Sequence, residues 1–269
     1  MLAFLPSGEA TVFFADAAAL RHAGMLNLLT GSKPVSDPEY QDFVRQTHFE
    51  YSKDLDAVAG KTNGEQLFLV LRGRFDWGKL RRYAAAHGGS CTKRICKLPG
   101  TRAARWASFI LIQPDVMGVA LSADSSAVEV LRPSGASGRP QMPAEPVWVN
   151  LPASLLRNPV NLPPPMRIFA IALQSADSVT LSLARPAENR STAFNVQLDA
   201  TCRNVSTADT ARDLLETQTK MLRLELTREH QEPNPADFTG LLTAGRFQVV
   251  DKHVMGTWPV SKELLSALE

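Results

Sequence analysis

Two aspartates, Asp54 and Asp56, are the first residues whose spacing suggests chemistry. Residues two apart in a strand point to the same face, so both carboxylates would lie together, where they could hold a cation or transfer a proton. A calcium ion needs about six to eight oxygen ligands, and no third acidic residue lies at a matching position. We therefore expect these aspartates to begin a solvated strand or to bind backbone amides, and Asp76 to cap a helix rather than to catalyse.

Other residue types that serve catalysis or metal binding form no recognised pattern. The five histidines are isolated, without a His-Glu-x-x-His motif. The stretch SGASG at residues 134–138 does not match the Gly-x-Ser-x-Gly elbow, and LRGRFDWG at residues 71–78 has the wrong spacing for a nucleotide-binding loop. We expect no catalytic residue, no metal site and no cofactor, and the sequence favours a non-enzymatic protein without deciding the question.

Positive charge is concentrated between Arg72 and Arg105. Ten basic residues against one acid give this segment a net charge of +9, and since the whole chain carries +2, the remainder carries −7. Such asymmetry can mark a contact surface for an acidic protein, a phospholipid headgroup or nucleic acid, although nucleic acid is disfavoured because no recognised binding module appears. Alternatively, the bases lie on solvent-exposed faces and pair with acids from elsewhere. The candidate surface consists of Arg72, Arg74, Trp77, Lys79, Arg81, Arg82, Lys93 and Arg94.

Two of the three cysteines are candidates for a disulfide. Cys91 and Cys96 enclose TKRI, which can turn back and bring their Cβ atoms within the roughly 4 Å that a disulfide requires. An oxidised pair would imply an oxidising compartment, and free thiols are the alternative. A metal site that adds His87 is disfavoured because a closed zinc site needs four ligands and Cys202 lies far along the chain.

The composition is that of an ordinary globular protein. A chain of 269 residues with 44% hydrophobic residues can bury one large core or two modest ones. No apolar run approaches the ~20 residues of a membrane-spanning helix. The N-terminus lacks the features of a signal peptide, so we expect either a cytoplasmic protein or one whose signal was removed. The final Leu268-Glu269 is typical of residues added before a purification tag, and the alternative is that it ends a natural helix.

Several local patterns predict the secondary structure. Asp37 followed by Pro38 predicts the start of a helix, and Asp76 predicts another that ends near Gly88. Asn63-Gly64 between two β-rich runs predicts a tight hairpin. In the second half, Ser206-x-x-Asp209 resembles a capping box at the start of a long helix.

Residues 132–146 separate two predicted units. This segment, RPSGASGRPQMPAEP, has almost no side chain able to enter a core, and we interpret it as a linker. The first unit then spans residues 1–131, and the second spans residues 147–269.

The order of elements recurs after the linker. The tripeptide Val-Met-Gly occurs at residues 116–118 and 254–256, and three collinear matches favour a duplication over chance. They align Phe14 with Val149, Phe68 with Phe194, and Val116 with Val254. Strands, helices and hairpins in this order predict an α+β fold with mostly antiparallel sheets and helices on one face. A pair of related ferredoxin-like βαββαβ units fits best, and one continuous sheet shared by both halves is the alternative.

THFEYSKDLDAVAG at residues 47–60 and LVLRGRFDWGKL at residues 69–80 resemble a group of uncharacterised exported bacterial proteins of unknown function. The resemblance covers mainly the first half of the chain. It departs at His48, where the group carries glycine; a histidine that ends a helix with positive φ does so at some steric cost. The resemblance implies export and an α+β fold, and it implies no reaction.

Together these patterns predict a non-enzymatic binding or scaffold protein of the periplasm or cell envelope with a basic contact surface. A cytoplasmic location is the alternative for the compartment. The alternative for function is an enzyme or small-ligand binder that uses a cleft between the two halves. The sequence leaves the oligomeric state open.

Overall fold

A computed structural model describes residues 1–26, 37–100, 104–133, 143–159, 164–184 and 192–268. The chain divides into two compact units, Met1–Pro146 and Val147–Glu269. The boundary falls at the C-terminal end of the predicted linker, most of which lies outside the described residues. Among the described residues, no helix is both long enough and apolar enough to cross a membrane.

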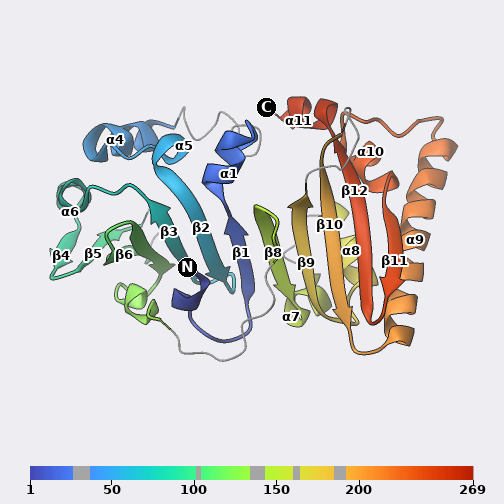
Figure 1. Cartoon of the computed structure of the whole chain (residues 1–269), viewed down its shortest axis with the longest axis horizontal. Helices are drawn as coiled ribbons and strands as arrows, with labels where there is room; N and C mark the ends of the chain where they lie inside the picture. The colour runs from blue at the N-terminus through green and yellow to red at the C-terminus, as the bar shows by residue number, and fades with distance from the viewer. Residues whose placement is uncertain (27–36, 101–103, 134–142, 160–163, 185–191, 269) are drawn as a thin grey trace. The chain divides into compact units, whose positions relative to one another are not determined.

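The first unit is an antiparallel sheet with the strand order β1-β2-β3-β7-β6-β5-β4 (Figure 1). Its strands are β1 (Thr11–Ala15), β2 (Leu55–Thr62), β3 (Leu67–Gly73), β4 (Ser90–Thr92), β5 (Ile95–Pro99), β6 (Trp106–Gln113) and β7 (Val116–Ser122). Its helices are η1 (Leu2–Phe4), α1 (Ala17–His22), α4 (Pro38–Thr47), α5 (Tyr51–Asp54), α6 (Trp77–Ala86) and η2 (Ala127–Val130).

Both faces of this first sheet are buried. Because neighbouring strand residues point to opposite faces, Val70 and Leu71 enter different cores. Val70 packs with η1 and η2, whereas Leu71 packs with α4 and α6. As predicted, α4 and α6 pack on one face of the sheet, whereas the short 3-10 segments η1 and η2 pack on the opposite face, which was expected to carry no helix.

The predicted turns and helix starts of the first unit are confirmed. The Asp37 carboxylate caps α4, which begins with Pro38, and the Asp76 carboxylate accepts a hydrogen bond from the Lys79 amide at the start of α6. Asn63 Oδ1 accepts hydrogen bonds from two amides in the β2–β3 hairpin, and Gly64 there has a φ of 93°. Local chemistry therefore fixes where these elements begin and turn.

The second unit is a smaller antiparallel sheet with the order β11-β12-β10-β9-β8 (Figure 1). Its strands are β8 (Val147–Pro152), β9 (Ala176–Ala184), β10 (Thr192–Cys202), β11 (Arg246–Val250) and β12 (His253–Ser261). Its helices are α7 (Ala153–Arg157), α8 (Pro164–Ala172), α9 (Val205–Arg228), α10 (Phe238–Thr243) and α11 (Lys262–Leu268). Side chains of α7, α8 and α9 share one core with the sheet.

The long helix α9 begins earlier than the sequence predicted. Asn204, not Ser206, is the N-cap, and its side chain accepts a hydrogen bond from the Thr207 amide. The Ser206-x-x-Asp209 capping box is therefore wrong, because asparagine is an equally good cap two residues earlier.

The α+β class and the antiparallel sheets are as predicted, whereas the ferredoxin-like plan is not confirmed. That plan splits βαβ units with intervening strands. Here, instead, β1 pairs directly with β2 and β8 with β9, both antiparallel.

Lys61 is the only buried basic residue among those described. It lies on β2, and its ammonium group donates hydrogen bonds to the carbonyls of Pro6 at 2.6 Å and Gly8 at 2.7 Å. Desolvation by burial lowers its pKa below the ordinary value of 10.5. The side chain therefore ties the segment before β1 to the sheet at the cost of burying a charge.

We predict that the free energy of unfolding of the first unit increases with pH in the alkaline range and that Lys61 causes part of this increase. The folded state binds this proton less tightly than the unfolded chain, so stability rises as pH increases through the lowered pKa towards 10.5. Denaturant unfolding between pH ~8 and ~10.5 should show this rise in the native protein and a smaller one in Lys61→Met. Other titrating groups are shared and cancel in the comparison. Identical pH dependence in both proteins would contradict the prediction.

Candidate functional sites

The two aspartates that the sequence placed together bind different partners. Asp54 is the last residue of α5, so the prediction that both belong to one strand is wrong. Its carboxylate accepts a hydrogen bond from the Glu50 amide at 2.9 Å and pairs with Arg74 at 3.0 Å. Asp56 pairs with Arg21 at 3.5 Å. The backbone-binding role is confirmed for Asp54, and the two carboxylates do not share a site.

The segments that carry the resemblance, residues 47–60 and 69–80, meet at the end of β3. The Arg74 amide donates to the Asp54 carbonyl at 2.9 Å, and the Arg74 guanidinium pairs with the carboxylate of the same residue. An added Cβ on Gly73 would lie 2.3 Å from the Asp54 carbonyl oxygen. These residues therefore hold two backbone segments in close contact, which is a structural role.

A shallow depression beside this junction contains both acids and bases. His48 ends α4 in the left-handed conformation with a φ of 60°, as its position in the pattern implied. Its Nδ1 atom lies 2.7 Å from Lys79 Nζ, which also lies 3.6 Å from the Asp76 carboxylate. The Lys79 amide lowers the pKa of Asp76. Among the described residues, no three His, Cys, Asp or Glu side chains are grouped to hold a metal ion.

The structure separates the eight residues of the candidate basic surface. Arg74 and Lys79 are each paired with an aspartate. Trp77 is half-buried and packs edge-on against Phe109, with ring centroids 5.5 Å apart. Arg72 follows Leu71 on β3, so it points to the sheet face opposite α6. The sequence alone did not show that these residues lie apart, because residues that are adjacent in the chain point to opposite faces of the sheet.

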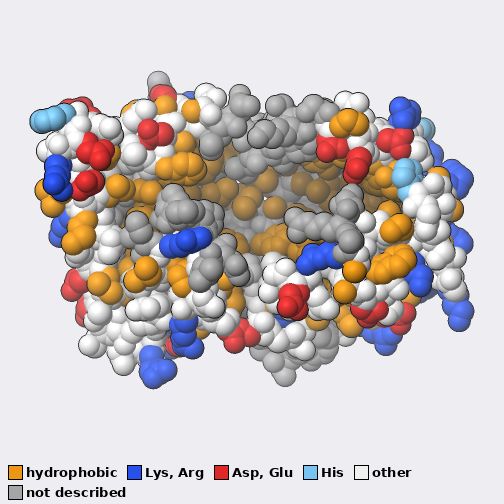
Figure 2. Space-filling model, turned by 180° about the vertical axis from the view of Figure 1, so that it is seen from behind, with side chains coloured by type: hydrophobic (Ala, Val, Ile, Leu, Met, Phe, Trp, Pro, Cys, Tyr) orange, Lys and Arg blue, Asp and Glu red, His pale blue; other side chains and the backbone are white. Residues whose placement is uncertain are grey.

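Four of the eight residues of the candidate basic surface lie together on one margin of the first unit. Arg81 and Arg82 are exposed on α6, and Lys93 and Arg94 form the exposed turn between β4 and β5. None of the four forms a salt bridge with an acid in the described part of the chain. Figure 2 shows Lys and Arg side chains along this margin of the molecule. We call these four residues the basic margin.

A disulfide closes the hairpin that carries half of the basic margin. Cys91 and Cys96 are cross-strand partners of β4 and β5 and are joined through their sulfur atoms. His87, considered as a third metal ligand, instead stacks on Tyr83 and lies 3.3 Å from the Asp42 carboxylate. The disulfide holds the turn with Lys93 and Arg94 in a fixed position on the sheet edge.

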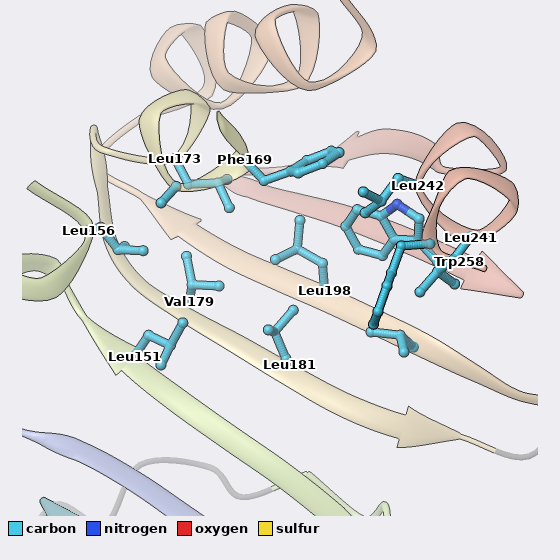
Figure 3. Close-up of a pocket in the computed structure, with 13 residues that line it drawn as sticks. Leu151, Leu156, Phe169, Leu173, Val179, Leu181, Leu198, Leu241, Leu242 and Trp258 are labelled. Carbon is cyan, nitrogen blue, oxygen red and sulfur yellow. The ribbon is translucent and has the colours of Figure 1, made fainter. Parts of the chain in front are cut away.

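The second unit contains a cavity that the sequence did not reveal. It lies between the sheet and helices α7, α8 and α10 and has a volume of about 370 Å³ (Figure 3). The thirteen described residues that line it are all hydrophobic. They are Leu151, Leu156, Phe169, Ala170, Leu173, Val179, Leu181, Val196, Leu198, Phe238, Leu241, Leu242 and Trp258.

The floor of the cavity belongs to the buried core of the unit, and its opening lies beside α10. Val179 and Leu198 of the floor are almost fully buried in the core of the unit. Phe238, at the start of α10, is 53% exposed and is the most exposed lining residue. The alternating hydrophobic residues of β9 and β10 look the same in sequence whether they face a packed core or an open cavity, so no pattern could have indicated this site.

No protein-family model matches the sequence, and no curated protein matches it either. Solved structures do match over nearly the whole chain. Crystal form IV of TP0453 superposes with a TM-score of 0.54 at 14% identity, covering 99% of this chain and 95% of that one. Crystal form III of TP0453 gives a TM-score of 0.53 at 14% identity, covering 99% of this chain and 96% of that one. At this identity the similarity establishes a shared fold alone.

Proposed function

We propose that this is a non-enzymatic binding protein whose second unit holds an apolar ligand between its sheet and helices α8 and α10. The observation that carries the proposal is the hydrophobic character of all thirteen lining residues. Ligand sites are mostly apolar, and catalytic sites add convergent polar groups to such a lining. The side chains of this lining supply hydrophobic surface and no acid, base or nucleophile.

The size of the cavity supports a ligand over a packing defect. A volume of about 370 Å³ falls within the roughly 300–1,000 Å³ of small-molecule sites and is larger than the voids that remain in a packed protein interior, few of which exceed one water molecule. Water is a poor occupant, because a buried water needs polar partners. An apolar guest gains dispersion contacts with the walls.

We predict that filling the cavity weakens binding of an apolar ligand. Val179→Phe places a ring in the floor and should weaken binding of the uncharged fluorescent probe N-phenyl-1-naphthylamine at least about tenfold. Val250→Phe is the matched control, since Val250 is 50% exposed on β11 of the same unit. The control should bind within about twofold of the native protein. Thermal unfolding would verify that both variants fold, and equal probe affinity in all three proteins would refute the proposal.

A second candidate function is favoured by the basic margin. Four exposed bases without salt bridges to described acids, two of them on a disulfide-closed turn, suit an acidic protein or an anionic component of the cell envelope. The envelope location rests on the resemblance to exported proteins. The competing explanation is that Lys93 and Arg94 protect the open edge of the sheet at β4 from pairing with other chains.

Charge reversal of the basic margin tests this second function. Changing Arg81, Arg82, Lys93 and Arg94 to glutamate should remove a partner crosslinked in the envelope fraction of host cells, because like charges then repel it. The matched control reverses four exposed bases of the second unit and should keep the partner. These are Arg203, Arg228, Arg246 and Lys252. Equal capture by both variants, or a partner found only in the cytoplasm, would reject the proposal.

We also propose that the two units arose by duplication. The strand order β1-β2-β3-β7-β6 in the first unit corresponds to β8-β9-β10-β12-β11 in the second. The three aligned residue pairs fall on corresponding strands: Phe14 and Val149 on β1 and β8, Phe68 and Phe194 on β3 and β10, and Val116 and Val254 on β7 and β12. The shared order and the aligned residues are independent observations that support one origin.

A further inference from the structure

We infer that the cavity of the second unit takes the single hydrocarbon chain of an amphiphile and leaves its polar end group in water. This inference rests on the proposed function and specifies the class of ligand. Three features carry it: the described lining residues offer no accessible polar group, the volume is small, and the lining extends across the sheet.

The described lining side chains contain one polar atom, and a ligand cannot reach it. Trp258 Nε1 is buried and has no hydrogen-bond partner among the described residues. An added Cβ on Gly245 would lie 2.6 Å from this nitrogen, so the indole N–H lies against the backbone at Gly245. A ligand hydroxyl or carboxylate drawn into the cavity would lose its water without gaining a partner. That loss weakens binding about 5- to 140-fold.

Two charged residues next to α10 are already engaged by that helix. Asp237 precedes Phe238, but its carboxylate caps α10 by accepting hydrogen bonds from the Thr239 amide and hydroxyl. Arg223 donates its guanidinium hydrogen bonds to the carbonyl of Thr243 at the other end of α10. Both groups bind the helix itself, so neither is free to pair with the polar end of a ligand.

The volume and the shape suit one chain. About 370 Å³ is at the lower end of the roughly 300–1,000 Å³ found for small-molecule sites, and it equals the volume of about twelve liquid waters. The labelled side chains in Figure 3 extend from Leu151 and Leu156 on one side to Leu241 and Trp258 on the other. They cross from β8 to β12 over three strand spacings, or about 14 Å. A cavity this long and this small excludes a second chain.

The test is a series of saturated single-chain amphiphiles of about eight to eighteen carbons with a carboxylate, an alcohol or a trimethylammonium end group. Each displaces N-phenyl-1-naphthylamine from the full-length protein below its micelle concentration. We expect affinity to rise about fourfold per methylene until the cavity is filled and then to level off. At equal length the three end groups should agree within about threefold, since none enters the cavity. Short diacyl phospholipids with the same chain length should bind at least about tenfold more weakly.

Two results would overturn the inference while leaving the proposed function intact. One is a difference above about tenfold between end groups of equal length, and the other is diacyl binding equal to single-chain binding. Trp258→Phe removes the indole N–H together with part of a lining ring, so the comparison is made between end groups in this variant and not with the native affinity. Any change should be equal, within about twofold, for the three end groups; a selective loss for carboxylates or alcohols would show that the N–H binds the ligand. If neither the probe nor any chain binds the folded protein, the proposed function itself fails.

Discussion

Leu215→Ala is expected to lower the free energy of unfolding of the second unit by about 3 kcal/mol, within the range of about 2–5 kcal/mol for such changes. Leu215 lies in the middle of α9, is fully buried, and packs in the core formed by α7, α8, α9 and the sheet. Ala208 and Ala211 precede it on the same face of the helix. Their small side chains bring α9 close to the sheet, so few large neighbours can move into the space that Leu215 leaves.

The same helix supplies the control for this prediction. Leu224 is 69% exposed, and Leu224→Ala removes the same atoms with nearly the same change in helix propensity. It should change stability by less than about 0.5 kcal/mol. Hydrogen exchange of α9 and β10 peptides would measure both effects within the second unit. If both variants lost the same amount of protection from hydrogen exchange, α9 would be stabilised by its helix propensity and not by packing against the core.

Residues that act on their immediate neighbours were predictable from the sequence. Asp37 and Asp76 cap their helices, and Asn63-Gly64 forms the hairpin, because each needs only amides or dihedral angles within a few residues. At Asp54 this local logic was half sufficient. The bond that its carboxylate accepts from the Glu50 amide lies within four residues and fits the predicted backbone-binding role. The contact with Arg74 spans twenty positions, which no local pattern specifies.

The candidate sites were predictable only where sequence neighbours are also neighbours in space. Lys93 and Arg94 stay together because they occupy one turn, whereas Arg72 and Lys79 are separated by the alternation of β3 and by the start of α6. The apolar cavity was not predictable at all. Its lining comes from four strands and three helices, and each contributes residues that would fit a solid core equally well.

Gly73→Ala is expected to destabilise the first unit by about 3 kcal/mol or more, although it adds only one methyl group. The new Cβ would lie 2.3 Å from the Asp54 carbonyl oxygen and 3.2 Å from Leu55 Cα, and both are backbone atoms that no side-chain rotation can move. The Gly73 amide also donates to the Asp115 carbonyl at 2.9 Å, so β3 is held from the other side as well. Relief of the clash must therefore separate β2 from β3 or break this hydrogen bond.

Arg72→Ala is the control for this substitution, because Arg72 is the exposed preceding residue of the same strand. It should change stability by no more than about 0.5 kcal/mol. Hydrogen exchange would locate the effect: Gly73→Ala should expose the amides of β2 and β3 and leave those of β9 and β10 protected. A loss of less than about 0.5 kcal/mol in Gly73→Ala would mean that the Asp54 backbone moves freely. The junction between residues 47–60 and 69–80 would then not be the rigid contact described above, and its glycine would require another explanation.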